Sequence, residues 1–557
     1  MSQSDGRGAI GRFVDELDVT VFGVGFAIAA VAVVGFLLSP DRTAEVMQGT
    51  NEYLWSTFGW AYLLVMFTLV AFVFFLIFSP WGNIKLGGPD EEPEFTFLAY
   101  FSMIYSAGIA AGIVFWGPAE AIFYFGDVPP LVGAEAETTG AAVGAIRYTF
   151  FHWGVSAWCA YTIMALPIAY YAYRHDAPIR ISTVIAPFVG LDNLESPWAK
   201  AIDVLAVFAT IGGVAATLGF VGSQFLVGIE YTTGTGVTDL GTILVITGLT
   251  VAFTISVALG VRKGIRRLSY FNMMLFGLLT ILTFLLGPTS YIMSVGTEAL
   301  GGYINQFIEM SFHTGAATGQ EEWVGTWTIF YWAWWFSWTP FVGLFIARIS
   351  RGRTVRQVAA TGVLASTAVT LPWFATMGAT SIFLQDAGQA DVLGTIEAFG
   401  GDEAAAGYPM FEALPVGFEA PLLGSLLMLL FIVLITTFFI TSADSSTLAL
   451  GMLTTGGVEQ PSTINRVIWG GFIGALASLL LVTGGTDALQ QAAIITGGPF
   501  ALITLLAVGV MILTFGKHHP LFMREENEAP IPSVEPDVGD GAAVETDGAG
   551  EAEDGDD

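Results

Sequence analysis

Long apolar runs separated by short polar segments dominate the chain. A helix needs roughly 20 mostly apolar residues to cross the hydrocarbon core of a bilayer. Twelve runs of suitable length cover residues 19–39, 56–79, 97–125, 146–172, 201–229, 238–260, 269–294, 327–348, 359–384, 421–453, 465–483 and 489–515. The pattern predicts an all-α integral membrane protein with twelve transmembrane helices.

Two longer polar segments interrupt this pattern. Gly296–Glu322 contains an amphipathic stretch, with Tyr303, Phe307 and Met310 on its apolar side, which predicts a helix lying along the membrane surface. Gln385–Ala420 is acidic and rich in Gly and Ala, which predicts a mobile loop. Both segments are expected on the outer side of the membrane.

The distribution of basic residues predicts the orientation. With the N-terminus cytoplasmic, all of the 19 Lys and Arg residues except Arg42 and Arg147 fall on the inner side. Residues 1–18 and the acidic tail 516–557 are then cytoplasmic, and the tail is expected to be disordered. The expected location is the plasma membrane.

Composition narrows the function classes. The chain is 54% hydrophobic and only 12% charged, whereas soluble domains carry roughly 25% charged residues. Cys159 is the only cysteine, and the five histidines show no ligand spacing, so disulfides, thiolate metal sites and haem-copper machinery are excluded. No nucleophile–base pair is evident, so we expect no enzyme activity. The net charge of −29 suggests a halophilic host, because high salt screens the repulsion.

An aromatic run, WTIFYWAWWFSWTPFVG, extends from Trp327 to Gly343. On an ideal helix Tyr331, Trp335 and Trp338 fall within roughly a 60° sector, with Trp334 at its edge. Indole rings around a small space would form a box for a quaternary ammonium group. The alternative is an aromatic belt at the membrane interface.

The third span contains a small-residue run, SAGIAAGIVFWGPAE, from Ser106 to Glu120. Such a run allows close helix packing, and it also allows a helix to open so that its backbone meets a ligand. Pro118 interrupts the helix, and Glu120 follows at apparent membrane depth. The residues alone leave both interpretations open.

The fourth span begins FHWGVSAWCAY, in which Trp153, Trp158 and Tyr161 do not share one helix face unless the helix bends near Gly154. These rings would either anchor the helix at the interface or surround a ligand.

The tenth span contains FFITSADSSTLALG, with an acid, Asp444, among several hydroxyls. Hydroxyls and broken-helix carbonyls suit Na⁺, and an intramembrane acid suggests a functional site. The alternative is hydrogen bonding between helices.

Six segments together resemble the betaine/carnitine/choline transporter family. They are IKLGGPDEEPEF (84–95), SAGIAAGIVFWGPAE (106–120), FHWGVSAWCAY (151–161), GVRKGIRRLSYFN (260–272), FYWAWWFSWTPFVGLFIARISRGRT (330–354) and TSADSS (441–446). The resemblance implies a LeuT-like fold. Two accessory helices (19–96) precede two inverted five-helix repeats (97–294 and 327–515), with an outer helix and loop (295–326) between the repeats. It also implies a homotrimer.

The resemblance also implies the site. The box around the trimethylammonium group would be Trp153, Trp158, Tyr161 and Trp335, with Trp334 and Trp338 beside the permeation path and the backbone of Gly108, Ile109 and Ala110 near the substrate carboxylate. Na⁺ would meet the carbonyls of Ser106, Ile109 and Phe438 and the hydroxyls of Thr441 and Ser442. A second sodium site of some members needs paired threonines, whereas here Thr210 is followed one turn later by Val214.

These features predict osmoprotective, Na⁺-coupled symport of glycine betaine or a related solute by alternating access. The partners would be that solute, Na⁺ as coupling ion and the lipid bilayer, with no cofactor and no nucleic acid. Three or four rings would bind the cationic group without a buried counter-ion. The alternatives are a choline or carnitine carrier, a sodium-independent precursor/product exchanger and, from another class, a ligand-gated channel or sensor.

Overall fold

A computed structural model describes residues 9–108, 110–259, 261–418 and 420–518. Within these residues every regular element is a helix, and the β-bridge between Lys85 and Thr354 belongs to no strand. The all-α prediction is therefore confirmed for this part of the chain. Residues 1–8 and 519–557, which include most of the predicted acidic tail, lie outside it.

The helices follow one another with short connections. They are α1 (Ala9–Glu16), α2 (Val19–Leu38), α3 (Pro40–Phe78), α4 (Phe97–Ala107), α5 (Ala110–Gly126), α6 (Thr139–Trp153), α7 (Val155–His175), α8 (Ala186–Val189), α9 (Pro197–Thr233), α10 (Asp239–Leu259), α11 (Val261–Leu286), α12 (Thr289–Phe312), α13 (Glu321–Trp323), α14 (Phe330–Ile349), α15 (Val355–Ala359), α16 (Ser366–Asp386), α17 (Val392–Ala398), α18 (Gly407–Glu412), α19 (Pro421–Leu453) and α20 (Thr463–His518). The 3-10 helices are η1 (Pro80–Asn83), η2 (Ile181–Ile185), η3 (Leu191–Asn193) and η6 (Glu403–Ala406), and the π-helical turns are η4 (Val324–Ile329) and η5 (Ala360–Ala365).

Ten helices in the described residues are long and apolar enough to cross a bilayer, or eleven when the bent pair α4 and α5 counts as one span. The last two predicted spans both lie in α20, whose backbone leaves the helical conformation at Gly484 and Gly485. At Gly485 φ is +59° and ψ is −148°, a combination that glycine adopts readily because it lacks a Cβ. The count of twelve spans stays a prediction.

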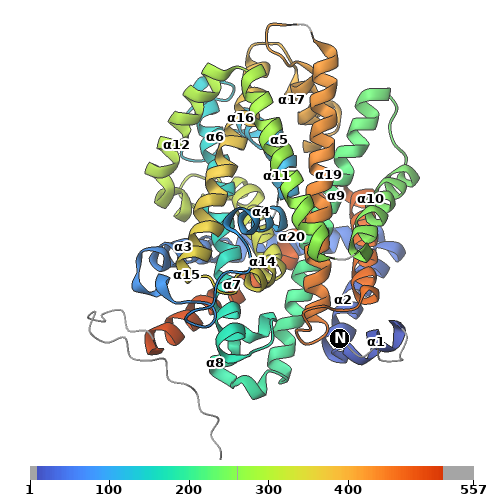
Figure 1. The fold of residues 1–557 in the computed structure, drawn as a ribbon. Coiled ribbons are helices and arrows are strands. Elements are labelled where there is room, and N and C mark those ends of the chain that lie inside the picture. The colour runs from blue at the N-terminus through green and yellow to red at the C-terminus, as the bar shows by residue number, and fades with distance from the viewer. Residues whose placement is uncertain (1–8, 109, 260, 419, 519–557) are drawn as a thin grey trace, which may run out of the picture.

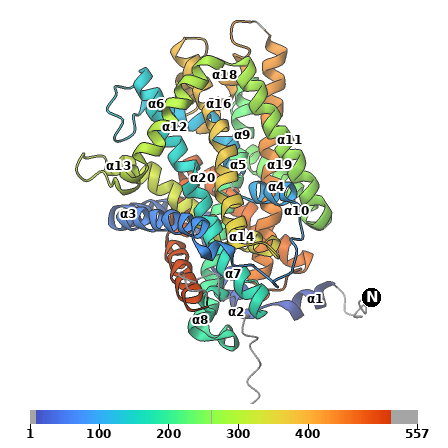
Figure 2. The same ribbon diagram turned by 60° about the vertical axis from the view of Figure 1, so that its left-hand side comes forward.

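The two ends of the molecule carry different segments. Figures 1 and 2 place α1 and α8 at one end; Figure 1 places α17 toward the other end, and Figure 2 places α18 at that other end. α8 lies between the fourth and fifth predicted spans, where Arg174, Arg180 and Lys200 are expected inside. α17 and α18 belong to the acidic segment 385–420 that is expected outside. The two segments therefore lie on opposite ends, as the charge pattern requires.

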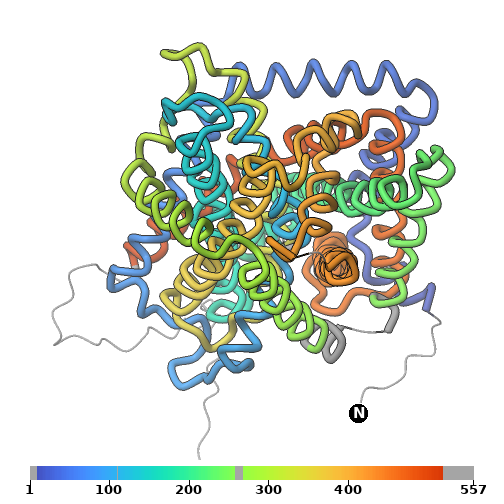
Figure 3. The backbone as a smooth tube through the Cα atoms, turned by 90° about the horizontal axis from the view of Figure 1, so that it is seen from above, coloured from blue at the N-terminus to red at the C-terminus, as the bar shows by residue number. Residues whose placement is uncertain are grey.

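Helix α3 has 39 residues, so it is ~58 Å long at 1.5 Å per residue, far longer than an upright span needs. Figure 3 shows this helix in blue, running along one edge of the bundle. Its inner face packs on α20 and α7. This accessory helix therefore braces the side of the bundle.

The predicted outer helix begins earlier than expected. The seventh span was expected to reach residue 294, but α11 ends at Leu286, and α12 begins at Thr289 after Gly287 and Pro288, both poor residues for continuing a helix. Tyr303 of α12 is buried against the ring of Phe150, with centroids 6.3 Å apart. The apolar face of α12 therefore packs on protein.

The expected mobile loop at Gln385–Ala420 is not a simple loop, because this segment contains α17, η6 and α18. Met410 and Phe411 are fully buried, and this apolar packing holds the segment in place. Glu403 is only 6% exposed, and its Oε1 accepts a hydrogen bond from Gln490 Nε2 at 2.8 Å. We call residues 385–418 the outer segment.

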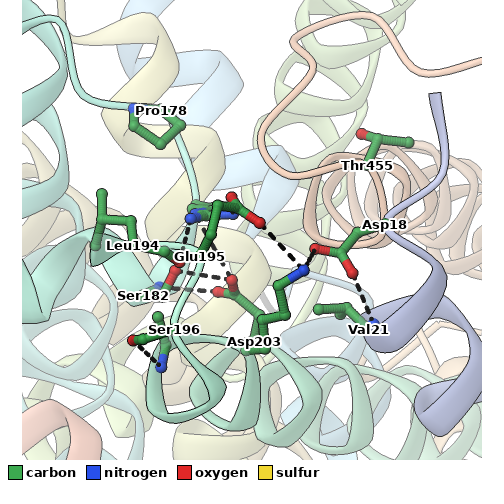
Figure 4. Close-up of polar contacts among 12 residues, drawn as sticks. Asp18, Val21, Pro178, Ser182, Leu194, Glu195, Ser196, Asp203 and Thr455 are labelled. Atoms are coloured by element: carbon green, nitrogen blue, oxygen red, sulfur yellow. Dashed lines mark hydrogen bonds and ion pairs between the residues drawn. The ribbon is translucent and has the colours of Figure 1, made fainter. Parts of the chain in front are cut away.

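At the opposite end, an ionic network joins the start of α2 to the start of α9 (Figure 4). Lys200 Nζ lies 3.0 Å from Asp18 Oδ2 and 3.1 Å from Glu195 Oε2, and Arg180 Nη1 lies 2.9 Å from Glu195 Oε1. Burial alone would raise the pKa of Asp18, but the hydrogen bonds from Lys200 and from backbone N–H groups of α2 hold that pKa below its usual value. The network fixes an accessory helix to the main bundle.

Candidate functional site

The glycine-rich third span is broken. α4 ends at Ala107, α5 begins at Ala110, and their axes differ by 63°. Gly108 has an extended backbone (φ −67°, ψ −169°), while its N–H still bonds the Ile104 carbonyl at 3.0 Å. Such a break frees carbonyl groups inside the bundle to meet a ligand. Ile109, which is predicted for both the substrate and the Na⁺ site, lies outside the described residues.

Four of the residues predicted to hold Na⁺ meet beside this break. Thr441 Oγ1 lies 2.7 Å from the Phe438 carbonyl oxygen and 3.2 Å from that of Ser106. Ser442 Oγ lies 3.3 Å from the Ser106 oxygen and 3.2 Å from that of Gly108, a carbonyl that was not predicted for this role. The two hydroxyls therefore link three carbonyl oxygens, so that five neutral oxygens from α4, the break and α19 form one connected cluster. Hard neutral oxygens are the ligand type that suits Na⁺.

Asn272 of α11 is a further member of this region that the sequence analysis missed. Its Nδ2 donates to the Thr441 hydroxyl at 3.3 Å and to the Thr437 carbonyl at 3.1 Å. The side chain is fully buried. In the sequence, the available signal was a single amide side chain, Asn272, just inside an apolar run. Only the fold shows that this side chain faces Thr441.

The fourth span bends at the expected glycine. α6 ends at Trp153 and α7 begins at Val155, and Gly154 between them has φ −80° and ψ −136°. A Cβ at Gly154 would lie 2.4 Å from the Phe150 carbonyl oxygen and 2.6 Å from the Tyr303 hydroxyl oxygen, so only glycine fits. That hydroxyl accepts a hydrogen bond from the Val155 N–H at 3.3 Å. The chain therefore changes direction directly after Trp153, and this residue does not continue the axis of α7.

The predicted box residues form two groups of ring contacts. In the first, Trp153 lies 4.7 Å from Trp335 at an interplanar angle of 66°, and Trp335 lies 5.3 Å from Trp334. In the second, Trp158 lies 6.0 Å from Tyr161 in an edge-to-face contact. Among the ring contacts of the described residues, none joins the two groups directly. Five predicted rings therefore fall into two separate contact groups, one on α6 and α14 and one on α7.

Burial tests the belt alternative. The side chains of Trp153, Trp158, Tyr161, Trp334, Trp335 and Trp338 are all 1% exposed or less. Belt residues face the lipid interface, so the belt interpretation is excluded for these six. Trp327 and Trp332 are also buried, which agrees with packing as their role.

Trp338 does not share the surroundings of Trp335. Its indole N–H donates to the Gly213 carbonyl of α9 at 3.1 Å, and its ring lies 4.9 Å from Phe341. A Cβ at Gly213 would lie 2.8 Å from the Trp338 ring, so the glycine permits this approach. Trp338 therefore packs between α14 and α9.

Several donors in this region have no hydrogen-bond partner among the described residues. They are Trp158 Nε1, Tyr161 Oη and Trp334 Nε1. A buried donor without a partner is costly, and in native proteins such a group usually has a ligand or a water nearby. Since all three belong to the predicted aromatic residues, they are candidates for contact with a polar part of the substrate.

Two buried acids lie near these groups. Trp153 Nε1 and Tyr331 Oη both donate to Oε2 of Glu120, so a carboxylate sits directly behind one ring of the box, where no counter-ion was expected. Asp444 of α19 accepts a hydrogen bond from Ser256 Oγ of α10 at 2.6 Å. Asp444 thus joins two helices instead of contributing to the five oxygens.

Comparison with known proteins identifies the family of the chain. The model of the BCCT family, betaine/carnitine/choline family transporters, matches residues 20–519. The chain is 41% identical over 507 residues to the glycine betaine transporter OpuD of Bacillus subtilis (89% of this chain, 94% of the relative). It is 36% identical over 511 residues to a probable glycine betaine transporter of Desulfitobacterium hafniense (91% and 99%). It is 37% identical over 482 residues to an ectoine/hydroxyectoine transporter of Virgibacillus pantothenticus (86% and 93%).

Proposed function

The chain belongs to the betaine/carnitine/choline family of transporters and is therefore a membrane transporter and not an enzyme, and we propose that it imports glycine betaine or a related quaternary-ammonium solute together with Na⁺. Relatives named for glycine betaine support the substrate. Further support comes from a set of buried rings without a basic side chain among their contacts in the described residues. The proposed activity is secondary transport by alternating access.

The five oxygens between α4 and α19 are the observation that carries the sodium proposal. The carbonyls of Ser106 and Gly108 come from one helix and its break, and the oxygens of Thr441, Ser442 and Phe438 come from another. An ion held by both helices would stabilise whichever conformation keeps them together. Na⁺ binding would thereby be coupled to the conformational equilibrium that exposes the substrate site.

The aromatic residues would bind the quaternary-ammonium end of the substrate. Cation–π attraction contributes ~0.5–2 kcal/mol per ring, so several rings bind a quaternary ammonium group usefully. The carboxylate of a zwitterion would meet the unpaired donors Trp158 Nε1 and Tyr161 Oη and the backbone near Gly108. A Cβ at Gly108 would lie 2.8 Å from the Trp158 ring, which shows how closely this backbone approaches the ring.

The architecture proposed with this function has twelve spans in two inverted five-helix repeats. The α4–α5 break and the π-helical turn before α14 lie at the expected starts of the repeats, and π-turns are frequent at functional sites. The kink at Gly484 and Gly485 would separate the last two spans. We further propose a homotrimer in the plasma membrane with both termini cytoplasmic.

Uptake into proteoliposomes tests the proposal. An inward Na⁺ gradient should drive radiolabelled betaine above its equilibrium concentration, and dissipating the gradient with an ionophore should abolish accumulation. Simple equilibration of betaine would point to a channel, and uptake unaffected by Na⁺ would point to an exchanger.

Ectoine is the second candidate substrate, because a similar relative is named for ectoine and hydroxyectoine. Competition of labelled betaine uptake by unlabelled betaine, choline, carnitine and ectoine would rank the candidates. Betaine should compete best. Stronger competition by ectoine would reassign the substrate.

A further inference from the structure

Glu120 of α5 is a fully buried acid whose role is not explained by the sodium site or by the ring contacts. Its Oε2 accepts hydrogen bonds from Trp153 Nε1 and from Tyr331 Oη, the latter at 2.9 Å, and its Oε1 lies 2.9 Å from His152 Nδ1. Among the described residues no Lys or Arg forms an ion pair with it. Glu120 thus joins the bent third span to α6 and α14 through partners that include a ring of the proposed box.

An ionised carboxylate satisfies this hydrogen-bond pattern. An indole N–H can only donate, so Oε2 is an acceptor for Trp153. His152 Nε2 lies 3.0 Å from the hydroxyl oxygen of Thr328. When that hydroxyl donates to Nε2, a neutral imidazole carries its proton on Nδ1 and donates it to Glu120 Oε1. The hydroxyl oxygen of Tyr124, 3.2 Å from Nδ1, then accepts from the same N–H. In this arrangement both nitrogens of His152 are satisfied, and the network carries one negative charge.

This charge acts on the box through Trp153. A carboxylate that accepts an indole N–H polarises the indole and makes the ring face more negative, and hydrogen bonds polarise one another most strongly away from water. Trp153 in turn contacts Trp335, whose Nε1 donates to the His152 carbonyl at 3.1 Å. The same cluster therefore holds two box rings and raises their attraction for a cation.

We propose that Glu120 is a specificity-determining residue that, through Trp153, selects a substrate with a positively charged head group over a neutral one of the same shape. This inference rests on the proposed function of the box. A unit charge acting across the width of one indole, ~8 Å, at an effective dielectric constant of 20 changes the affinity for a cation by roughly thirtyfold. A neutral head group would gain almost nothing.

The test uses the purified full-length protein in saturating Na⁺ and two ligands. Glycine betaine carries a trimethylammonium group, and 3,3-dimethylbutyrate carries a neutral tert-butyl group of nearly the same shape on the same carboxylate. Direct binding of labelled betaine and its displacement by dimethylbutyrate give two dissociation constants. Their ratio measures selectivity for the positive charge.

Glu120→Gln removes the charge and keeps an oxygen acceptor. We expect it to weaken betaine binding about tenfold or more while the dimethylbutyrate constant changes less than about threefold. Tyr331→Phe is the matched control, because it removes one hydrogen bond to Glu120 and leaves the charge, so it should weaken both ligands equally. Glu120→Asp keeps the charge on a shorter side chain and should retain the wild-type ratio even if both affinities fall.

Three outcomes would overturn the inference. An equal loss for both ligands in Glu120→Gln would make Glu120 a merely structural support for the rings. If the ratio of the two dissociation constants and both affinities are unchanged, the charge of Glu120 does not affect binding in the box. Absence of betaine binding to the wild-type protein would instead refute the proposed function, and this inference with it.

Discussion

Removing the two hydroxyls between α19 and α4 should selectively weaken Na⁺ dependence. The perturbations are Thr441→Ala, Ser442→Ala and the double variant. Each hydroxyl oxygen lies within 3.3 Å of two carbonyl oxygens of the cluster, so each would supply one ligand to an ion there. Neither side chain is exposed beyond 1%, so water has little room to replace it.

The magnitude follows from the cost of losing a polar contact to a charged group. Such contacts contribute about 1.5–3 kcal/mol, which corresponds to roughly a 10- to 150-fold change in an equilibrium constant. Each single variant should therefore raise the half-saturating Na⁺ concentration about tenfold or more. The double variant should show no saturation at accessible salt. At an Na⁺ concentration that saturates the wild type, its betaine affinity should fall, because bound Na⁺ and betaine favour the same conformation.

Uptake of labelled betaine into proteoliposomes at varied outside Na⁺, with ionic strength held constant, measures this effect. Ser446→Ala is the matched control, because its hydroxyl donates only within its own helix, to the Ala443 carbonyl at 3.0 Å. Thr441→Ser keeps the oxygen and should stay within about threefold of wild type. If the double variant folds and its Na⁺ dependence is unaltered, the cation site lies elsewhere and the reasoning fails.

Three further predictions concern other parts of the molecule. Trp335→Leu should lower betaine affinity about 2- to 30-fold, since one ring contributes ~0.5–2 kcal/mol, whereas Trp335→Phe should retain most of it; equal kinetics in both variants would remove Trp335 from the box. Gly108→Ala would place a Cβ 2.8 Å from the Trp158 ring, so it should reduce betaine binding about tenfold in equilibrium binding assays, and unchanged binding would show that the ring yields freely. Burial, with the nearby charge of Asp402, raises the pKa of Glu403 to about 8 from its usual 4.5, so the stability that it contributes is fully present below pH ~4.5 and is lost as the pH rises through 8. The thermal midpoint of the detergent-solubilised protein should fall over that interval, and Glu403→Gln should flatten the profile; a parallel fall in the variant would assign it to other groups.

The candidate site residues could be proposed from the sequence because their signals are local. A hydroxyl-rich turn inside an apolar run pointed to Thr441 and Ser442, and a small-residue run pointed to the break at Gly108. Gly154, among the aromatic residues at the start of the fourth span, indicated the bend that directly follows Trp153. Each signal depends on helix periodicity or on residues that end helices, and both act over one or two turns.

Other features depend on packing and had no local signal. The outer segment, read as a loop from its Gly, Ala and acid content, is held by buried contacts such as those of Phe411. Trp338 shares a helix sector with Trp335. Its indole N–H nevertheless donates to the carbonyl of Gly213 on a neighbouring helix. Asn272 meets Thr441 across a separation of 169 residues.

By itself the sequence determined which segments are apolar enough to cross a membrane, where two of them break, and which chemical groups are proposed for a cation and a quaternary ammonium group. Hydrophobicity and backbone propensity decide these properties locally. Only the tertiary structure decided which groups meet, because hydrogen bonds and ring contacts form between helices that are distant in the chain. Glu120 illustrates this: the sequence placed an acid at membrane depth, and only the packing of α5 on α6 and α14 put it behind Trp153 and Tyr331.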